Sequence, residues 1–442
     1  MSTKIGIVSL GCDKNRVDTE VMLANLVKGG YEIVSDPQLA DVIIVNTCAF
    51  LESARKEAIQ SALEMASYKK LGKCQKVIIT GCLGQKFGAE VFDELHEVDA
   101  VVGTENYDDI CDIVSSALQG ERKLYQSCAE KITFGSRILT TAPHIAYLKI
   151  ADGCDNFCTY CLIPYIRGRF RSVELERLIE QAAELASKGV KELILVAQDV
   201  TRYGKDLYGD FKIAELVHKL SLIEGIEWIR LLYCYPELMD DKLIDEIVAN
   251  DKVVKYVDIP LQHVNDEILR KMNRRSNGKS IRELFDKLSD KGIQARSTFI
   301  CGFPYETKQT VKEIEDFLVQ YKLRNVGFFA YSREDGTAAA KFDCQVPSRT
   351  KENYVKRLYK VQYKIADKLN NNDIGKVYKC IIDELPEFSD GKYFYVGRTY
   401  FMTPEIDGQV FIVSQKELAV GGFYDVKITG AVEYDLLGEV VE

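Results

Sequence analysis

Residues 149–172 read KIADGCDNFCTYCLIPYIRGRFRS, and the rest of the fold can be worked out from this segment. It completes a predicted strand, AYLKIAD (146–152), and continues into a loop with the spacing C-x-x-x-C-x-x-C, whose cysteines are Cys154, Cys158 and Cys161. Three thiolates on one tight loop can hold three irons of a cubane cluster and leave the fourth iron without a protein ligand. The segment therefore predicts an iron–sulfur site with an open position for a substrate.

Zinc is the main alternative for this loop. Structural zinc usually takes four ligands, often from two C-x-x-C pairs, and the chain contains no second pair. A disulfide framework is also unsuitable, because the chain has 13 cysteines and an odd number cannot be fully paired. We therefore favour thiolate chemistry at this loop over structural metal or purely structural cysteines.

The sequence after the cysteine loop alternates between strand and helix patterns. Five more apolar runs have the length and composition of strands: ELILVAQD (192–199), WIRLLYC (228–234), YVDIPLQ (256–262), ARSTFICG (295–302) and VGFFAYS (326–332). Six strand-and-helix units predict an open α/β barrel, because eight such units close a full one. Functional sites in this architecture lie at the carboxyl ends of the strands, which is where the cysteine loop begins.

A smaller domain is predicted before the barrel. Strand patterns alternate with helical ones from residue 4 to about 118, which predicts a parallel sheet of the Rossmann or flavodoxin type. The strands are KIGIVSL (4–10), DVIIVNT (41–47), KVIIT (76–80) and AVVGT (100–104), with helices near 17–28, 52–68 and 107–118.

A second small domain is predicted after the barrel. A helix over residues 350–371 is followed by runs of period two: KVYKCIID (376–383), KYFYVGRT (392–399), QVFIVSQ (409–415) and YDVKITGAVEYDLLGEVV (424–441). This pattern predicts a small antiparallel β-barrel. We place the domains at 1–135, 136–372 and 373–442.

The composition excludes several classes of protein. With 442 residues, of which 46% are hydrophobic, the chain can bury several cores. Its net charge of −9 argues against a protein built mainly to bind phosphate backbones. The first residues lack the pattern of a secretory signal, and no apolar run approaches the ~18 residues needed to span a bilayer. We therefore expect a cytoplasmic protein without a membrane anchor.

A second set of cysteines follows the strands of the amino-terminal sheet. Cys12 comes after KIGIVSL, Cys48 after DVIIVNT and Cys82 after KVIITG. Because the carboxyl ends of parallel strands share one edge of a sheet, these thiols are expected to converge and hold a second cluster. The alternative is a role as small core residues, which we assign to the remaining cysteines: Cys74, Cys111, Cys128, Cys234, Cys301, Cys344 and Cys380. Asp18 and Glu20 are predicted to favour the start of the following helix.

The cysteine loop, with Tyr160 just before its last cysteine, resembles the signature of the radical S-adenosylmethionine (SAM) enzymes. The resemblance implies that the open iron chelates the amino and carboxylate groups of SAM, whose reductive cleavage gives a 5′-deoxyadenosyl radical. Gly302, Phe303 and Pro304 follow a strand, as does the cofactor-side glycine turn of that superfamily. The superfamily commonly shows G-F-P-G-E-T, and this chain has Tyr305 in place of the second glycine.

Over its whole length the chain resembles the methylthiotransferases, which combine an amino-terminal domain with three separated cysteines, a radical SAM barrel and a terminal β-barrel of the TRAM type. The segments SLGCDKNRVDTE, NTCAF and TGCLGQ match the family's auxiliary-cluster motifs, so the resemblance assigns Cys12, Cys48 and Cys82 to a second 4Fe-4S cluster. It implies that one SAM methylates sulfur on the auxiliary cluster and another makes the radical that activates a C–H bond. It also implies a low-potential electron donor such as flavodoxin or ferredoxin.

Polar residues at other strand ends are candidates for contacts with SAM. Gln198 and Asp199 follow the second barrel strand, and Gln262 follows the fourth. With Tyr160 and Gly302 they form the cofactor-binding set that the resemblance implies. A loop cap is the alternative for each of the strand-end residues.

The roles of several charged residues stay open at the sequence level. Arg167, Arg169 and Arg171 either contact carboxylates of cofactor or substrate through bidentate hydrogen bonds, or form a solvated basic loop. Nothing in the sequence gives His263 an acid or base role. We assign no catalytic acid or base.

The family divides between enzymes that modify transfer RNA adenosines and a branch that modifies an aspartate of small-subunit ribosomal protein S-twelve. The wording S-L-G-C-D-K-N-R-V-D, C-D-N-F-C-T-Y-C with I-R-G-R-F-R-S, and V-D-I-P-L-Q-H resembles the ribosomal-protein branch. The transfer RNA branches more usually read G-C-Q-M-N and P-L-Q-S-G. The resemblance implies transfer of a methylthio group to the β-carbon of that aspartate, with a transfer RNA adenosine as the alternative.

The charge of the terminal barrel supports the protein substrate. Residues 375–442 contain six basic and twelve acidic residues, a net charge of −6. A module that binds RNA should be basic, whereas an acidic surface is complementary to a basic ribosomal protein. An ordinary solvated surface is the alternative. Five aromatic residues are candidate contacts, although strand alternation places about half of them in the core: Tyr393, Phe394, Tyr395, Tyr400 and Phe401.

Overall fold

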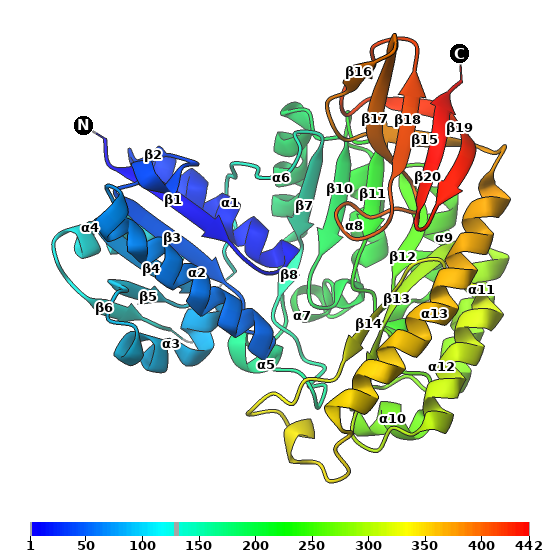
Figure 1. Cartoon of the computed structure of the whole chain (residues 1–442), viewed down its shortest axis with the longest axis horizontal. Coiled ribbons are helices and arrows are strands. Elements are labelled where there is room, and N and C mark those ends of the chain that lie inside the picture. The colour runs from blue at the N-terminus through cyan, green and yellow to red at the C-terminus, as the bar shows by residue number, and fades with distance from the viewer. Residues whose placement is uncertain (1, 128–131, 442) are drawn as a thin grey trace.

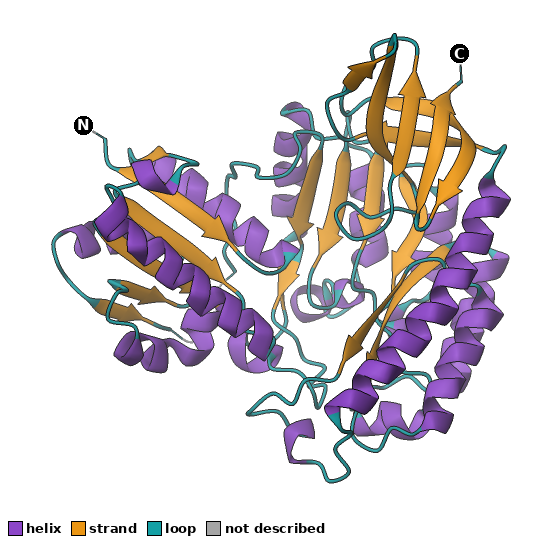
Figure 2. Ribbon diagram, viewed as in Figure 1, coloured by secondary structure: helices purple, strands orange, loops and turns teal. Residues whose placement is uncertain are grey.

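The structure is a computed structural model that describes residues 2–127 and 132–441, and it contains three six-stranded sheets (Figures 1 and 2). The amino-terminal sheet, drawn in blue in Figure 1, lies beside the central green sheet, and the terminal barrel in orange and red lies at the upper end. The long helix α13 (Ser348–Asp373) connects the central sheet to the terminal barrel. All three predicted folds are therefore present.

The amino-terminal sheet is parallel throughout and has the order β2-β1-β3-β4-β5-β6, as predicted. Its strands are β1 (Lys4–Ser9), β2 (Glu32–Ile33), β3 (Val42–Thr47), β4 (Lys76–Gly81), β5 (Ala100–Val102) and β6 (Lys123–Tyr125), and its helices are α1 (Asp13–Lys28), α2 (Glu52–Leu71), α3 (Cys82–Glu94) and α4 (Ile110–Leu118). The sequence did not predict α3, because its glycines weaken helix propensity. Gly84 is needed there, since an added Cβ would lie 2.4 Å from the carbonyl oxygen of Val102.

The central sheet is the predicted open barrel, with the parallel order β14-β13-β12-β11-β10-β7. Its strands are β7 (Ile145–Lys149), β10 (Glu192–Val196), β11 (Trp228–Leu231), β12 (Val253–Asp258), β13 (Gln294–Cys301) and β14 (Val326–Ala330), and a short ribbon pairs β8 (Ala151–Asp152) with β9 (Arg171–Ser172). The helices are α5 (Ile163–Ile166), α6 (Leu175–Ser187), α7 (Lys205–Tyr208), α8 (Ile213–Ser221), α9 (Asp241–Ala249), α10 (Asp266–Lys271), α11 (Gly278–Asp290) and α12 (Lys308–Tyr321).

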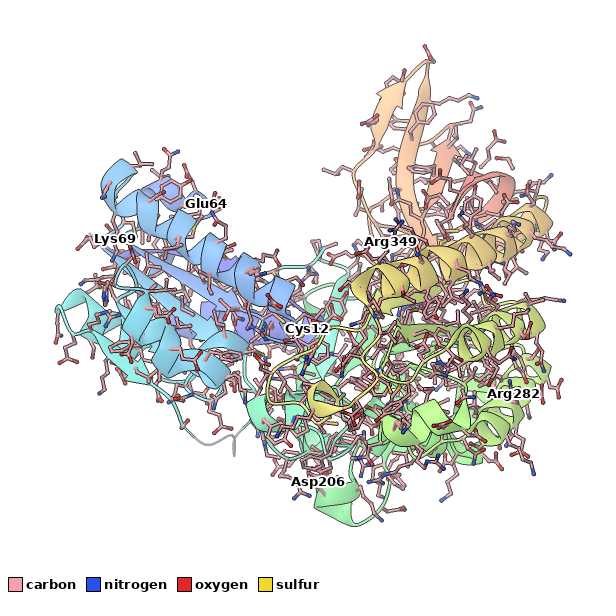
Figure 3. All side chains as sticks on the ribbon, turned by 60° about the horizontal axis from the view of Figure 1, so that its bottom comes forward. Cys12, Glu64, Lys69, Asp206, Arg282 and Arg349 are labelled. Carbon is pink, nitrogen blue, oxygen red and sulfur yellow. The ribbon has the colours of Figure 1, made fainter. Side chains whose placement is uncertain are left out.

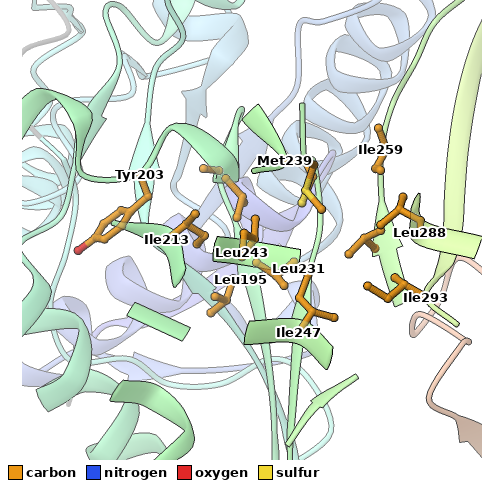
Figure 4. Close-up of a cluster of buried hydrophobic side chains, with 14 of the residues drawn as sticks. Leu195, Tyr203, Ile213, Leu231, Met239, Leu243, Ile247, Ile259, Leu288 and Ile293 are labelled. Atoms are coloured by element: carbon orange, nitrogen blue, oxygen red, sulfur yellow. The ribbon is translucent and has the colours of Figure 1, made fainter. Parts of the chain in front are cut away.

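Buried aliphatic side chains hold the helices against the outer face of this sheet. Figure 4 shows Leu195 and Leu231 of the strands beside Leu243 and Ile247 of α9, and all four are fully buried. Local capping fixes where the helices begin: the side chain of Asp240 accepts a hydrogen bond from the backbone N–H of Leu243. Burial of each such aliphatic side chain contributes about 1.5–3 kcal/mol, so this layer supplies a large share of the stability.

The terminal barrel contains β15 (Val377–Ile382), β16 (Glu387–Ser389), β17 (Lys392–Thr399), β18 (Val410–Ser414), β19 (Phe423–Val432) and β20 (Asp435–Val440). It closes because β15 pairs with both β17 and β19. The barrel is antiparallel, as predicted, except for one pair, β18 and β20, which run parallel. This follows from the β19–β20 hairpin, which places β20 between β19 and β18.

Strand alternation in this barrel sorts the aromatic residues as expected. Tyr395 and Phe401 are buried in the barrel core. Phe394, next to Tyr395 on β17, faces outward and is 41% exposed. The terminal barrel packs on the central sheet through Trp228, whose ring centroid lies 4.9 Å from that of Phe423.

Helix α1 joins the amino-terminal domain to the central sheet. Its Asp18 forms a buried ion pair with Lys149 of β7, and its Glu20 accepts a hydrogen bond of 3.0 Å from Arg137. The role predicted for Asp18 and Glu20 at the helix start is therefore wrong, because α1 begins at Asp13 and both carboxylates are consumed by the domain interface. Figure 3 shows Cys12 at this junction. Among the described residues, no helix is long and apolar enough to cross a membrane.

Candidate functional site

The cysteine loop places a hydrogen-bond donor near each of its three sulfurs. The backbone N–H of Asn156 donates to Cys154 Sγ at 3.5 Å, and that of Ile163 donates to Cys161 Sγ at 3.4 Å. Cys158 Sγ lies 3.9 Å from Arg274 Nη1 and 4.0 Å from Tyr235 Oη. Hydrogen bonds to sulfur stabilise thiolate ligands and tune the clusters that they hold.

Burial opposes the free thiolate form of two of these cysteines, Cys154 and Cys161. It raises the pKa of Cys154 to about 12, although the backbone N–H of Asn156 acts in the opposite direction. Burial also raises the pKa of Cys161. A metal ion must therefore supply the charge that keeps these sulfurs ionised, as expected of buried metal ligands.

A second segment of the barrel holds the cysteine loop in place. Asn273 Nδ2 donates to the carbonyl oxygens of Asn156 and Phe157 at 3.2 and 2.9 Å. The backbone N–H of Thr159 donates to the carbonyl oxygen of Met272 at 3.1 Å. Phe157 and Asn273 have φ values of +47° and +58°, an unfavourable conformation that is often found at functional sites.

The other three predicted ligands meet at the edge of the amino-terminal sheet. Cys12, Cys48 and Cys82 follow β1, β3 and β4, which are neighbours in the sheet. Both Cys12 and Cys48 act electrostatically on Cys82, where burial raises the pKa to about 12. Cys12 precedes helix α1 and Cys82 is the first residue of α3, so two of the three sulfurs lie at helix N-termini.

Glycine precedes Cys12 and Cys82 for a steric reason. Gly11 and Gly81 both have φ of +96°, which is rarely adopted by other residues. A Cβ on Gly11 would lie 2.8 Å from the Cβ of Cys48, and a Cβ on Gly81 would lie 2.6 Å from the carbonyl oxygen of Thr47. The glycines therefore let the three strand ends approach. The repeated Gly-Cys dipeptide is a signal that sequence analysis overlooked.

Arg167 links the two sets of cysteines. It is 2% exposed, and its Nη1 donates to Asp18 of the amino-terminal domain at 2.7 Å and to Asp152 of the barrel at 3.0 Å. Its guanidinium charge opposes the rise in the pKa of Cys82 that burial causes. Asp152 lies two residues before Cys154, so one side chain connects the two sites.

The other arginines after the cysteine loop differ from Arg167. Arg169 is exposed and pairs with Asp155 at 2.6 Å. Arg171 lies 3.7 Å from Glu105. Arg274, which sequence analysis did not single out, lies beside Cys158, and its guanidinium carbon is 4.2 Å from the centre of the Tyr235 ring. The signal in the sequence that could have identified Arg274 is the basic run that begins at the end of α10.

Of the five predicted SAM contacts, Tyr160 lies within the cysteine loop and the other four follow strands of the central sheet. Tyr160 is half-buried, with its ring centroid 6.4 Å from that of Phe303. Gln198 Nε2 donates to Asp152 at 3.0 Å, while its buried Oε1 has no partner among the described residues. Gln262 has φ of +69°, so it too is held in an unfavourable conformation after β12. Gln198 Oε1 is therefore a free acceptor for a bound polar group.

Asp199 is the fifth predicted contact, and its carboxylate is occupied by protein. It is fully buried and accepts hydrogen bonds from Asn156 Nδ2 at 2.9 Å and Thr201 Oγ1 at 2.6 Å. These contacts hold Asn156, which lies inside the cysteine loop, against the end of β10.

The glycine turn after β13 keeps its shape despite the missing second glycine. Tyr305 adopts φ of +71°, which explains why glycine is common at this position. Gly302 has φ of +75°, and an added Cβ would lie 2.2 Å from Lys351 Cγ. Glu306 accepts hydrogen bonds from the N–H groups of Gly302 and Phe303 at 3.0 and 3.2 Å and thereby ties the turn together.

His263 is buried beneath this turn. Its Nδ1 accepts hydrogen bonds from two backbone N–H groups, and its Nε2 lies 3.9 Å from Glu306 Oε2. Burial lowers the pKa of His263 to about 3, so the ring is neutral at physiological pH. Its Nε2 has no hydrogen-bond partner among the described residues.

The donor sets fit iron–sulfur clusters. In residues 2–127 and 132–441 no group of three His, Cys, Asp or Glu side chains is arranged to hold a single metal ion. A cubane binds each cysteine through a different iron, so its ligand sulfurs do not converge on one point. Of the cysteines given structural roles, Cys74, Cys234, Cys301 and Cys380 are buried, Cys111 is half-buried, Cys344 is exposed, and Cys128 lies outside the described residues.

Comparison with known proteins identifies the family. The profile of the radical SAM superfamily matches residues 148–318, that of the TRAM domain matches 374–441, and that of the uncharacterized protein family UPF0004 matches 4–103. The ribosomal protein uS12 methylthiotransferase RimO of Clostridium kluyveri is 47% identical, with 99% of this chain and 98% of the relative covered. The chain belongs to the RimO family. RimO of Acetivibrio thermocellus is also 47% identical, over 100% of this chain and 99% of its own length.

Membership of the RimO family makes the chain a radical SAM methylthiotransferase. A solved structure with the same fold is the radical SAM methyltransferase TsrM of Kitasatospora setae, with a TM-score of 0.56 and 13% identity over 89% of this chain and 77% of TsrM. The cobalamin-dependent enzyme OxsB gives a TM-score of 0.52 and 13% identity over 80% of this chain and 56% of OxsB. These distant structures confirm the fold.

Proposed function

We propose that this chain transfers a methylthio group to the β-carbon of an aspartate in ribosomal protein uS12. The observation that carries the proposal is the identity of 42–48% to RimO proteins over at least 99% of the chain. Its supporting geometry is the pair of cysteine sets, joined through Arg167. The C–H bond to be modified offers no acidic proton, so general-base chemistry is insufficient and a radical cofactor is required.

Two 4Fe-4S clusters are part of this proposal. Cys154, Cys158 and Cys161 would hold the cluster that binds SAM and supplies radical chemistry. The sheet-edge cysteines, Cys12, Cys48 and Cys82, would hold the auxiliary cluster. Because each set offers only three sulfurs, each leaves one iron open.

The surroundings of the cysteine loop would orient SAM. Tyr160 lies within the loop, and Gln198, Gln262 and Gly302 follow strands of the same sheet. The unpartnered Oε1 of Gln198 can accept a hydrogen bond from an amino or hydroxyl group. Asp199 would act on the cofactor through Asn156, since its own oxygens are already occupied.

The acidic terminal barrel would receive the ribosomal protein. A groove of about 460 Å³ on this barrel has Phe394, Phe411 and Leu437 among its lining residues. Glu384 and Glu387 lie at the same groove, and both are exposed. Apolar side chains flanked by carboxylates suit a basic segment with apolar residues, and the negative charge would steer that partner to the surface.

Three further features of the proposal concern organisation. The domains would be 1–135 for the auxiliary cluster, 136–372 for the radical SAM barrel and 373–442 for the TRAM barrel. The electron donor would be a low-potential carrier such as flavodoxin or ferredoxin. The substrate implies action in the cytoplasm, where ribosomes assemble.

The test is anaerobic reconstitution with iron and sulfide, followed by incubation with SAM, a strong reductant and either uS12 or bulk transfer RNA. We expect mass spectrometry to show one methylthio group on an aspartate of uS12. Methylthioadenosine in digested RNA would overturn the substrate but keep the chemistry. Bound zinc without SAM cleavage would overturn the enzyme altogether, and about four instead of about eight irons per chain would overturn the auxiliary cluster.

A further inference from the structure

The cysteine loop reaches the protein surface through an exposed aromatic pair. Phe157 lies between Cys154 and Cys158 in the sequence and is 42% exposed. Tyr165 follows the loop on α5 and is 61% exposed, with its ring centroid 6.5 Å from that of Phe157. Large aromatic side chains so exposed, next to a functional loop, are typical of interaction surfaces.

Basic residues are concentrated in a segment that contacts the cysteine loop next to this pair. Residues 270–279, RKMNRRSNGK, contain five basic and no acidic residues, in a chain of net charge −9. Arg270 and Arg275 are exposed and form no salt bridge among the described residues, while Lys271 pairs with Glu267. On the other side, Lys86 Nζ lies 5.8 Å from the centre of the Tyr165 ring.

The basic segment is attached directly to the cysteine loop. Asn273, between Arg270 and Arg275, donates a hydrogen bond of 2.9 Å to the carbonyl oxygen of Phe157. The hydroxyl of Thr159 donates to the carbonyl oxygen of Lys271 at 2.8 Å. A partner that contacts the two arginines therefore also lies against the backbone that carries Cys158.

Acidic residues also lie at this surface: Asp266 and Glu267 on α10 are exposed, and so is Asp335, next to Gly336, where an added Cβ would lie 3.8 Å from Lys86 Nζ. Asp155 is only partly exposed and forms a bidentate contact with Arg169, at 2.6 and 3.2 Å. In Figure 1, α5 and α10 lie on the lower side of the molecule and the terminal barrel lies at the top. The basic surface and the acidic barrel are thus at opposite ends, so partners of opposite charge can bind at the same time.

We propose that Lys86, Phe157, Tyr165, Arg270 and Arg275 form a docking surface, here called the donor surface, for an acidic protein that carries single electrons at low potential. The carrier is oxidised by one electron, and the cluster held by the loop cysteines accepts that electron, with no bond formed or broken. A basic partner such as a ribosomal protein would be repelled here. The inference rests on the cluster assignment within the proposed function.

The test measures docking separately from methylthio transfer. Reconstituted full-length protein is compared with the double variant Arg270→Glu/Arg275→Glu and with the control Lys364→Glu/Lys368→Glu, which makes the same charge change on exposed positions of α13. Reduced flavodoxin serves as the acidic carrier, and photoreduced deazaflavin as a small reductant that needs no docking. Titration calorimetry gives flavodoxin affinity, and stopped-flow absorbance gives the rate of cluster reduction.

We expect the double variant to lose about tenfold or more in flavodoxin affinity and reduction rate at low salt, because two attractions become repulsions. The rate of reduction by deazaflavin should be unchanged. High salt screens charges, so it should reduce the difference in flavodoxin affinity between the wild type and the double variant. Tyr165→Ser, which leaves the charges intact, should weaken flavodoxin binding at both salt concentrations.

Equal losses in the α13 control would overturn the donor surface, since net charge alone would then explain them. Slower reduction by deazaflavin in the double variant would also overturn it, because the cluster itself would be damaged. Loss of uS12 binding with intact flavodoxin reduction would assign the surface to the substrate instead. If wild-type protein is reduced by flavodoxin but modifies no uS12, the donor surface stands and the proposed function fails.

Discussion

The two sets of three cysteines are brought together in different ways. The loop set lies within eight residues, Cys154 to Cys161, and two of its three sulfurs accept hydrogen bonds from the backbone of the same loop. The sheet-edge set spans residues 12 to 82 and meets only because β1, β3 and β4 are parallel neighbours.

Each set has a buried arginine beside it, and the origin of that arginine differs. Arg274 lies 3.9 Å from Cys158 and belongs to the same barrel. Arg167 acts on Cys82 but comes from the barrel, across the domain interface. The loop site is thus complete within one domain, whereas the sheet-edge site is completed by docking two domains together.

The largest effect should come from breaking the loop set. Under the proposed assignment, Cys158→Ala removes a ligand of the cluster that would bind SAM, so SAM cleavage and methylthio transfer should both fall below detection. The measurement is 5′-deoxyadenosine formation under strong reductant, with iron content as a control. The auxiliary cluster should remain, at about four irons per chain. Cleavage at the wild-type rate would contradict the assignment.

Breaking the sheet-edge set should separate the two reactions. In Cys82→Ala we expect iron to fall to about four per chain while 5′-deoxyadenosine still forms, because the loop cluster is intact. Methylthio transfer to uS12 should stop. Cys74→Ala, at a buried cysteine outside both sets, is the matched control and should retain both reactions.

Removing the arginine that joins the sites should destabilise the protein. Arg167→Met leaves the two buried carboxylates of Asp18 and Asp152 with only Lys149 as a cation, so one negative charge is uncompensated, which should cost about 3–5 kcal/mol of unfolding free energy. Arg169→Met removes an exposed cation, whose ion pair is screened by solvent, and should cost much less. Urea unfolding of the metal-free proteins compares the two variants. An equal loss of unfolding free energy in both would show that the buried ion pairs of Arg167 do not stabilise the interface more than an exposed pair does.

The close approach of the sheet-edge strands predicts a smaller effect. Gly81→Ala adds a Cβ 2.4 Å from Asn46 Oδ1, in addition to the cost of alanine at positive φ. Gly120 has φ of +95° and open space around it. Gly120→Ala should therefore lose only about 1–2 kcal/mol of stability, the cost of placing alanine at positive φ. Thermal unfolding should show Gly81→Ala as the less stable variant, and Gly81→Ala should also retain less iron.

The last prediction is a pH dependence of stability at the glycine turn after β13. Burial raises the pKa of Glu306 from 4.5 to about 7, so its contribution to stability is fully present below pH 4.5 and is lost as the pH rises through about 7. Glu306→Gln lacks this titration. The stability of wild type minus that of Glu306→Gln should therefore fall between pH 5 and pH 7.5, as measured by urea unfolding. An unchanged difference would show that Glu306 is ionised throughout.

Much of the fold and of the loop site was predictable because the signals are local. The six barrel strands, the parallel amino-terminal sheet and the C-x-x-x-C-x-x-C loop follow from hydrophobic periodicity and residue spacing. Helix α3 escaped prediction because Gly84 and Gly88 weaken its pattern, and the parallel pairing of β18 with β20 depends on where the last hairpin inserts. The groups that serve the sites were harder to find, since Asn273 and Arg274 are far from the cysteines in sequence.

Local sequence therefore determined which cysteines can bind metal on the loop, where the strands lie and that the terminal barrel is acidic, because each of these depends on neighbouring residues. Only the tertiary structure places Arg167 beside Cys82. It also decides that Asp18 and Glu20 form ion pairs at the domain interface and that Asp199 accepts a hydrogen bond from the cysteine loop. Those roles arise when segments that are far apart in the sequence pack against each other and exclude water. Burial then makes each unpaired charge costly, so the partner across the interface sets the role of the residue.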